Sequence, residues 1–223
     1  MTKFAVIGLG MFGYRVAVTL AERNAEVIAV DKDPRKIEAL KDTVTLAVRM
    51  DSSIEENLIA QGINRVDSAL VCIGENFEAN LLTTVLLKKL GVKQVIARAA
   101  NDIQSQILKL VGADRIISPE DDMGKKIAQN LLMSSILDYI PLTNGHSLVQ
   151  IKTPSSFLHK KLRDLQLRDL YKVNVVAIKE QGVDHDGKTI EKIHSVPDPD
   201  HIFVENDVLV VVGSNSDIEK IAK

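Results

Sequence analysis

Short apolar, β-branched runs alternate with helical patterns over residues 1–118. The segments between the runs have the length and the 3.6-residue spacing of amphipathic helices. Strands that alternate with helices indicate βαβ units, and right-handed crossovers between six strands predict a doubly wound parallel sheet of order 3-2-1-4-5-6. The runs are almost continuously apolar, as expected for strands covered on both faces. The six runs are Lys3–Gly8, Glu26–Val30, Val44–Val48, Ser68–Ile73, Gln94–Arg98 and Arg115–Ile117.

A further helix is expected after the sixth run, because Pro119 suits a first helical position. We expect its apolar face to extend from Ile127 to Ile140, where it covers the sheet or reaches another subunit. Pro, Thr, Asn and Gly gather in Pro141–His146, which predicts a linker. The chain is therefore predicted to contain a domain at 1–140, crossover helix included, and a second domain at 141–223.

The second part of the chain has a different pattern, typical of a small α+β domain. A helical piece is expected at His159–Leu170, and turns at Asp184–Lys188 and Pro197–Asp200. A domain of roughly 80 residues is near the lower limit for independent stability, so pairing with a second copy is expected. Its predicted strands are Leu148–Ile151, Val173–Ile178 and Val208–Val212.

Charge and cysteine content narrow the classes of function. The net charge of the 223 residues is −2, and residues 1–140 carry 17 basic and 18 acidic side chains. Neither part has the basic excess that binding of nucleic acid requires. Cys72 is the only cysteine, so no intramolecular disulfide can form, as suits a reducing cytosol. No apolar run approaches the ~18 residues of a membrane span. Met1–Ile7 enters a strand directly, and we expect no signal peptide.

The strongest local motif is a glycine loop between the first strand and the first helix. Gly8, Gly10 and Gly13 frame Leu9, Met11 and Phe12 in the pattern GxGxxG. The first two glycines permit a tight turn and close approach of backbone to phosphate, and the third permits the helix to pack on the strand. The helix N-terminus then presents free N–H groups to an anion. The motif in this context predicts a Rossmann-like nucleotide-binding domain, although the same glycines could form a turn that binds no ligand.

Asp31 ends the second strand, 18 residues after Gly13. A carboxylate at this distance from the loop can accept hydrogen bonds from both ribose hydroxyls of an adenosine, and it disfavours a 2′-phosphate. The alternative is that Asp31 caps the helix that begins near Asp33-Pro34.

Further candidate ligand residues follow the carboxyl ends of other strands, where ligands lie in this fold. Each of them could instead be a helix cap or a solvated turn. The set comprises Lys32, Asp51, Ser52, Ile73, Gly74, Glu75, Asn76, Arg98 and Glu120.

Groups for catalysis are missing from the predicted nucleotide domain. All five histidines lie beyond residue 140, so the crevice has no histidine from its own domain as a general base. Cys72 lies within an apolar run and is interpreted as a small core residue, and no Cys or His cluster suggests zinc. A ligand-binding sensor is therefore favoured over a small NAD-dependent oxidoreductase. A redox-sensing transcription regulator, the other alternative, would need a basic domain.

Four segments of the chain carry a family resemblance: Phe4–Gly13, Val71–Asn80, Val111–Ile117 and Ser118–Gly124. Together they resemble RCK (regulator of potassium conductance) proteins, in particular the cytosolic subunits of Ktr and Trk potassium uptake systems. The resemblance extends over essentially the whole chain, since this family carries a small C-terminal domain.

The resemblance implies a non-enzymatic, cytoplasmic regulator. It implies a homo-oligomeric ring, usually an octamer, docked beneath a membrane potassium transporter. ATP and ADP, or in some members NAD(H), would change the shape of this ring and thereby gate the transporter. The resemblance further implies that Glu120 lies near Mg²⁺ or another cation at the nucleotide phosphates. In the C-terminal domain, Arg168 and Pro197 match positions near a cyclic di-AMP site.

One residue departs from the family pattern. Ktr-type loops usually carry an arginine where this chain has Met11, and that arginine reaches the terminal phosphate bound by a neighbouring subunit. Arg15 follows one helical turn later on the same face and is the candidate to substitute for it, although a side chain that does not reach would leave ATP and ADP alike. Discrimination between ATP and ADP therefore depends on whether Arg15 reaches that phosphate.

Overall fold

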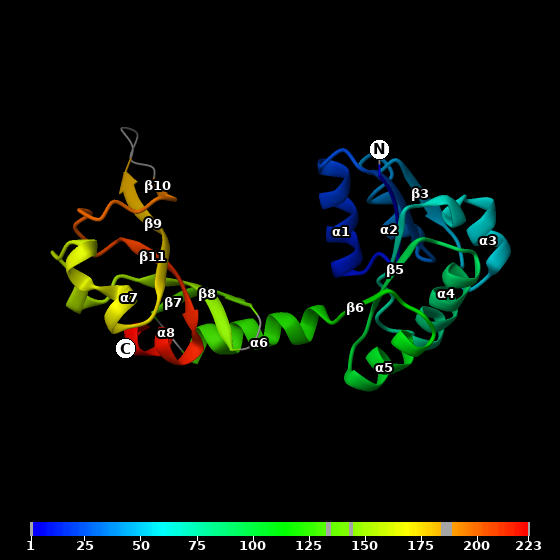
Figure 1. Cartoon of the computed structure of the whole chain (residues 1–223). Coiled ribbons are helices and arrows are strands. Elements are labelled where there is room, and N and C mark those ends of the chain that lie inside the picture. The colour runs from blue at the N-terminus through cyan, green and yellow to red at the C-terminus, as the bar shows by residue number, and fades with distance from the viewer. Residues whose placement is uncertain (1, 133–134, 143–144, 184–188, 223) are drawn as a thin grey trace. The chain divides into compact units, whose positions relative to one another are not determined.

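The structure is a computed structural model that describes residues 2–132, 135–142, 145–183 and 189–222. It divides into two compact units, Met1–Met123 and Gly124–Lys223. Each unit has its own sheet (Figure 1). In the described part of the chain, none of the helices combines the length and the apolar character needed to cross a membrane.

The first unit is built on a six-stranded sheet in which every neighbouring pair is parallel. The order β3-β2-β1-β4-β5-β6 confirms the predicted doubly wound topology. Its strands are β1 (Lys3–Ile7), β2 (Glu26–Asp31), β3 (Leu46–Arg49), β4 (Ser68–Val71), β5 (Gln94–Arg98) and β6 (Arg115–Ile117). The helices that connect and follow them are α1 (Met11–Glu22), α2 (Pro34–Glu38), α3 (Glu55–Ala60), a 3-10 turn (Ile63–Arg65), α4 (Phe77–Lys89), α5 (Asp102–Leu110) and α6 (Pro119–Leu132).

Both faces of this sheet are covered, which explains why its strands are apolar at successive positions. In β1, Ala5 and Ile7 belong to the same core as Leu87 of α4, whereas Val6 belongs to a separate core with Ala17 of α1. All five side chains are at most 1% exposed. The strand ends on which a ligand site could be built are therefore held by two layers of helices.

The second unit contains a five-stranded antiparallel sheet of order β10-β9-β11-β8-β7. Its core gathers Phe157, Phe203 and Leu209 with two residues of α8, Ile218 and Ile221. The predicted α+β character is confirmed. The elements are β7 (Ile136–Pro141), β8 (His146–Lys152), 3-10 turns (Ser155–Phe157 and Leu162–Leu165), α7 (Leu167–Leu170), β9 (Asn174–Val183), β10 (Thr189–His194), β11 (Val208–Ser214) and α8 (Asn215–Ala222).

The prediction of one helical face up to Ile140 is wrong. Helix α6 ends at Leu132, and Ile136 begins β7, where it pairs with Ile151 of β8. Ile136 is buried in the core of the second unit, whereas Ile140 is half exposed. The apolar spacing of this stretch fits a helix as well as a strand, and only pairing with β8 decides between them.

The predicted linker at Pro141–His146 has strand residues at both ends, since Pro141 ends β7 and His146 begins β8, and residues 143–144 lie outside the described residues. The N–H of Leu142 donates to the carbonyl of His146 at 2.9 Å. Gly145 takes a φ of +71°, a left-handed conformation that glycine adopts without strain. The expected division after residue 140 thus falls at the end of a strand of the second sheet.

Four further differences from the sequence-based expectations concern single elements. Strand β10 and helix α8 were not expected, and β3 starts at Leu46 rather than two residues earlier. The helical piece expected from His159 to Leu170 is broken in two, because Gln166 has a φ of +45°. The turn expected at Asp184–Lys188 lies outside the described residues.

Candidate functional site

A cavity of about 890 Å³ opens at the carboxyl ends of the strands of the first unit. This is where ligands bind in open parallel sheets, at the point where the strand order reverses between β1 and β4. The cavity wall contains most of the residues expected from the sequence: Gly8, Gly10, Met11, Phe12, Asp31, Lys32, Ser52, Ile73, Gly74, Glu75, Asn76, Arg98 and Glu120. Gly13, Arg15 and Asp51 are not part of that wall.

The glycine loop is packed so closely that two of its positions have no room for a side chain. Gly8 has a φ of +92°, and a Cβ there would lie 2.8 Å from the backbone nitrogen of Ile73. A Cβ on Gly13 would lie 2.0 Å from the carbonyl oxygen of Gly8. Gly8 and Gly13 therefore have the structural roles expected of them, the tight turn and the close contact of helix with strand. Around Gly10, by contrast, no atom lies within 4 Å of such a Cβ.

Helix α1 presents an uncapped N-terminus to the cavity. Gly10 precedes its first residue, Met11, no described side chain caps it, and the first turn carries no acidic residue. The first backbone N–H that bonds back into the turn belongs to Tyr14, which donates to the carbonyl of Gly10 at 2.9 Å. The N–H groups before it and the positive end of the helix dipole are suited to an anion.

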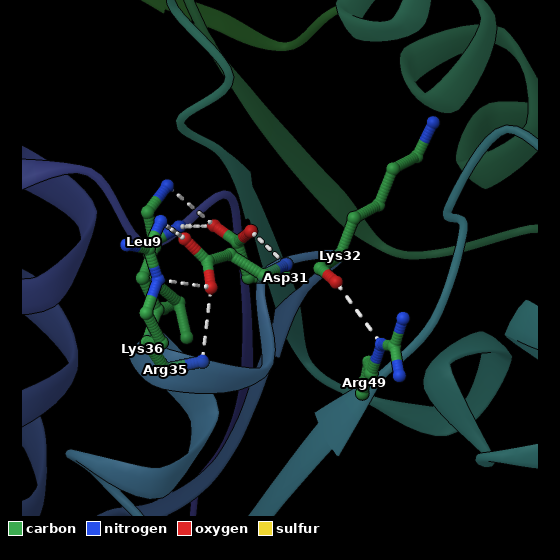
Figure 2. A network of polar contacts seen from close by, with 7 residues as sticks. Leu9, Asp31, Lys32, Arg35, Lys36 and Arg49 are labelled. Atoms are coloured by element: carbon green, nitrogen blue, oxygen red, sulfur yellow. Dashed lines mark hydrogen bonds and ion pairs between the residues drawn. The ribbon is translucent and has the colours of Figure 1, made fainter.

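Asp31 connects the glycine loop to the start of α2 (Figure 2). Its Oδ2 accepts from the N–H of Leu9 at 2.7 Å and from Nζ of Lys36 at 3.2 Å, and its Oδ1 accepts from the N–H of Asp33 at 2.9 Å. Burial raises the pKa of Asp31, but the two backbone hydrogen bonds and Lys36 outweigh it, so the pKa is lowered. The cap of α2 is Asp33, which accepts from the N–H of Arg35, and not Asp31.

Lys32 lies at the rim of the cavity and is held from outside it. Its Nζ pairs with Oδ2 of Asp51 at 2.9 Å. Its carbonyl accepts from Nε of Arg49 at 3.2 Å, as Figure 2 shows. The hydrogen bond from Lys32, with help from Ser53, lowers the pKa of Asp51 to about 2. Asp51 thus positions Lys32 and does not line the cavity.

Two of the predicted residues have clear local structural roles. Ser52 is buried, and its hydroxyl hydrogen-bonds the hydroxyl of Thr83 at 2.9 Å. Asn76 caps α4, because its Oδ1 accepts from the N–H of Ala79 at 2.9 Å. The helix-cap alternative is therefore correct for Asn76, which also lines the cavity.

Asn80 is a structural residue of the site that the sequence-based analysis missed. Its Nδ2 donates to the carbonyls of Ile73 at 2.8 Å and Arg98 at 2.9 Å, and its side chain is almost completely buried. It thus joins the backbone after β4 to the end of β5. A buried amide in the first turns of a helix, where an apolar residue is usual, was the available signal.

Arg98 and Glu120 form an ion pair at the same end of the cavity. Nη2 of Arg98 contacts Oε1 of Glu120, while Nε of Arg98 is buried without a hydrogen-bond partner among the described residues. Burial raises the pKa of Glu120, but the hydrogen bond from Arg98 outweighs it and lowers that pKa. The carboxylate expected beside a cation is therefore bound to a guanidinium here. No group of three His, Cys, Asp or Glu side chains among the described residues is arranged to hold a metal ion.

Cys72 lines the cavity and is buried, and the prediction of a small core residue is confirmed. Burial raises the pKa of its thiol to about 12. Because the thiolate is the nucleophilic form, this thiol is unreactive at neutral pH.

Lys36, Tyr14 and Met50 also line the cavity and were not expected from the sequence. For Lys36, the available signal was a basic residue one turn into the helix that follows Asp31.

The remaining candidates lie elsewhere. Arg15 is exposed on α1. In the second unit, Arg168 is exposed on α7, and its Nε donates to Oδ1 of Asn174 at 2.9 Å. Pro197 is half-buried in the segment that follows β10.

Comparison with known proteins identifies the family. The TrkA-N domain model matches residues 4–119, and the TrkA-C domain model matches residues 147–223. Ktr system potassium uptake protein C of Bacillus subtilis is 40% identical over 221 residues, which cover 99% of this chain and 96% of that protein.

Two solved structures of GsuK are also similar. The GsuK RCK domain matches with a TM-score of 0.53 at 22% identity, over 98% of this chain and 45% of that one, which supports the fold. GsuK bound to ADP matches with a TM-score of 0.50 at 25% identity, over 60% of this chain and 34% of that one. The predicted resemblance is therefore confirmed: the chain belongs to the TrkA-N/TrkA-C (RCK) family and is a homologue of the Ktr system potassium uptake proteins.

Proposed function

We propose that this protein is a cytoplasmic regulatory subunit of a Ktr-type potassium uptake system and that it senses an adenine nucleotide in the cavity of its first unit. The observation that carries the proposal is the composition of that cavity. It combines a glycine loop that has no room for a side chain at Gly8 and Gly13, an uncapped helix N-terminus and a carboxylate at the end of β2. These groups match the phosphates and the ribose of a nucleotide.

ATP and ADP are the ligands we favour, and NAD(H) would use the same groups. The ADP complex of GsuK supports an adenine nucleotide. Asp31 would accept a hydrogen bond from a ribose hydroxyl at Oδ1, since Leu9 and Lys36 use Oδ2 and Asp33 uses only one of the two lone pairs of Oδ1. The first-turn N–H groups of α1 would bind the phosphates.

Regulation is favoured over turnover by the chemistry of the cavity wall. Its thiol, Cys72, is protonated at neutral pH, and every histidine of the sequence lies beyond residue 145. A cavity that binds a nucleotide without reacting it can shift the balance between two conformations if the ligands differ in their affinity for them.

A cation at the phosphates, Mg²⁺ or another, would require ligands from the nucleotide itself. Glu120 could supply one oxygen, because it lines the cavity and is 64% exposed. The phosphate oxygens and water would complete the coordination that Mg²⁺ prefers.

We propose that Arg15 reads the terminal phosphate across a subunit contact. Met11, at the usual position of the arginine, is 95% exposed and cannot pair with phosphate. Arg15 is exposed on the same helix and lies outside the cavity of its own chain, as a group that acts on a neighbouring copy would. ATP would then bind more tightly than ADP, and Arg15→Ala would abolish the difference while sparing AMP.

The assembly we propose is a homo-oligomeric ring, an octamer, docked on the inner face of the membrane through a potassium transporter subunit. Apolar side chains exposed along α6, among them Met123, Ile127 and Leu131, support subunit contacts. In the second unit, Arg168 and Pro197 are proposed for cyclic di-AMP, with Asn174 holding the guanidinium.

Calorimetric titration of the full chain with ATP, ADP, AMP and NADH tests the proposed function. We expect ATP and ADP to bind, and we expect Asp31→Ala to raise the Kd of each. Absence of binding by all four ligands would refute nucleotide sensing. Consumption of NADH with an added carbonyl substrate would instead support the oxidoreductase alternative.

A further inference from the structure

The ion pair between Arg98 and Glu120 lies in the wall of the proposed nucleotide cavity. We propose that a phosphate group of the ligand displaces Glu120 from Arg98 and thereby releases the start of α6. This inference rests on the proposed function. Arg98 recognises the phosphate, and the carboxylate of Glu120 competes with that phosphate for Arg98. Ligand occupancy would then be communicated by exchange of one anion for another.

Arg98 lies next to the glycine loop. A Cβ on Gly8 of the loop would contact Ile73. Gly74 follows Ile73 in the chain, and a Cβ on Gly74 would lie 1.9 Å from Nη1 of Arg98. The guanidinium therefore occupies the space that the missing side chain of Gly74 leaves beside the loop. Its Nε is buried without a partner among the described residues, so one N–H of the fork can still take an acceptor.

The other two cations of the cavity wall are already neutralised by carboxylates that have separate roles. Lys32 pairs with Asp51, which is not part of the wall, and Lys36 pairs with Asp31, which also holds the loop. Glu120 differs from both, because apart from its own backbone N–H its carboxylate is held only by Arg98 among the described residues. It is therefore the carboxylate that can leave Arg98 without breaking a contact to the backbone of another residue.

Exposure favours Glu120 over Arg98 as the group that moves. The side chain of Glu120 is 64% exposed, whereas that of Arg98 is 19% exposed. A released Glu120 is thus readily rehydrated. The backbone of Arg98 is fixed by Asn80, and its planar fork suits a phosphate with two or three acceptor oxygens better than a single carboxylate oxygen.

The exchange has a direct consequence for α6. Glu120 is in the first turn of this helix, which begins in the first unit and continues to Leu132 in the second. The N–H of Asp122 donates to the carbonyl of Ser118 at 2.9 Å, so amide exchange at this position reports on the first turn. Loss of the ion pair removes a tie between this turn and the end of β5.

The inference predicts opposite effects for the two partners. In calorimetry with ADP in the presence of EDTA, Glu120→Gln should tighten binding by about two- to fivefold, since the competing ion pair is of the partly exposed kind. Adenosine should bind unchanged, because it has no phosphate. Arg98→Gln should weaken ADP without affecting adenosine, and adding Glu120→Gln to Arg98→Gln should have no further effect on ADP. Asp122→Asn, which removes the same charge from the same helical turn, is the matched control and should leave the ADP affinity unchanged.

Hydrogen exchange of the wild-type chain provides a second measurement. ADP should accelerate exchange at Asp122, and adenosine should not. Weaker ADP binding by Glu120→Gln in EDTA, or equal exchange with both ligands, would overturn the inference while nucleotide binding itself stands. If neither ADP nor adenosine binds the wild type, the proposed function fails as well.

Discussion

Replacing Asp31 by asparagine should weaken both the fold and the ligand site. The carboxylate accepts from two backbone N–H groups, those of Leu9 and Asp33, and from Lys36 (Figure 2). Asparagine has the same shape but only one acceptor oxygen, so its NH₂ group must face one of these donors. Either the loop or the start of α2 then loses its hydrogen bond.

The size of the effect follows from burial. Leu9 is 3% exposed and the side chain of Asp31 is 11% exposed, so an unpaired donor costs about 1–3 kcal/mol. Loss of the attraction to Lys36 adds up to ~1 kcal/mol, and relief of the buried charge offsets part of the sum. We expect a net destabilisation of about 1.5–3 kcal/mol, and a loss of ADP affinity of about 1–3 kcal/mol if the carboxylate also holds the ribose.

Urea unfolding monitored by circular dichroism measures the first effect, and its pH dependence identifies the cause. The pKa of Asp31 is lowered by folding from 3.8. Its contribution is therefore fully present above pH 3.8 and is lost as the pH falls through the folded-state pKa. The difference between wild type and Asp31→Asn should shrink in that acidic window.

Asp67→Asn is the matched control. Asp67 also accepts from a backbone N–H, that of Lys3 at 2.9 Å, and pairs with a lysine, Lys93, but it does not line the cavity. Asp67→Asn should lower stability and leave the Kd for ADP unchanged. Unfolding of Asp31→Asn at the wild-type urea concentration would contradict the structural role of Asp31, and binding of ADP with the wild-type Kd would contradict its role in the ligand site.

Three further predictions concern packing, assembly and acid stability. Gly13→Ala should lower the midpoint of thermal unfolding, since its Cβ would lie 2.0 Å from the carbonyl oxygen of Gly8. Gly10→Ala has open space around its Cβ, so it should keep that midpoint but weaken the binding of ADP in calorimetry. Light scattering at micromolar concentration should give a mass well above 24.5 kDa, and a strictly monomeric species would contradict the proposed ring. Lys32 lowers the pKa of Asp51 from 3.8 to about 2, so the wild type should lose the contribution of Asp51 to stability as the pH falls through this range. Asp51→Asn should lower the free energy of unfolding in urea by about 1 kcal/mol above pH 3.8, after allowance for solvent screening. The same dependence of stability on acid pH in both proteins would contradict this.

The fold of the first unit could be predicted almost completely from the amino-acid sequence. Alternation of apolar runs with helical spacing predicted the strand order, because parallel strands buried on both faces and joined by right-handed crossovers leave few topologies. The glycine loop and Asp31 could be located in the same way, since glycine at positions 8 and 13 has a steric cause that acts within one βα unit. The candidate cavity wall was accordingly predicted in most of its residues.

Features that depend on pairing between distant parts of the chain could not be predicted from local sequence patterns. The apolar pattern around Ile136 fits the end of a helix as well as the start of a strand, and the pairing of Ile136 with Ile151 places it in a strand. Arg98 and Glu120 are 22 residues apart and belong to different elements, so their ion pair could not be inferred from either one. Asn80 joins the two strand ends beside the cavity for the same reason. Local propensity acts over a few residues, whereas these choices depend on which distant backbone or charge the fold brings within hydrogen-bond distance.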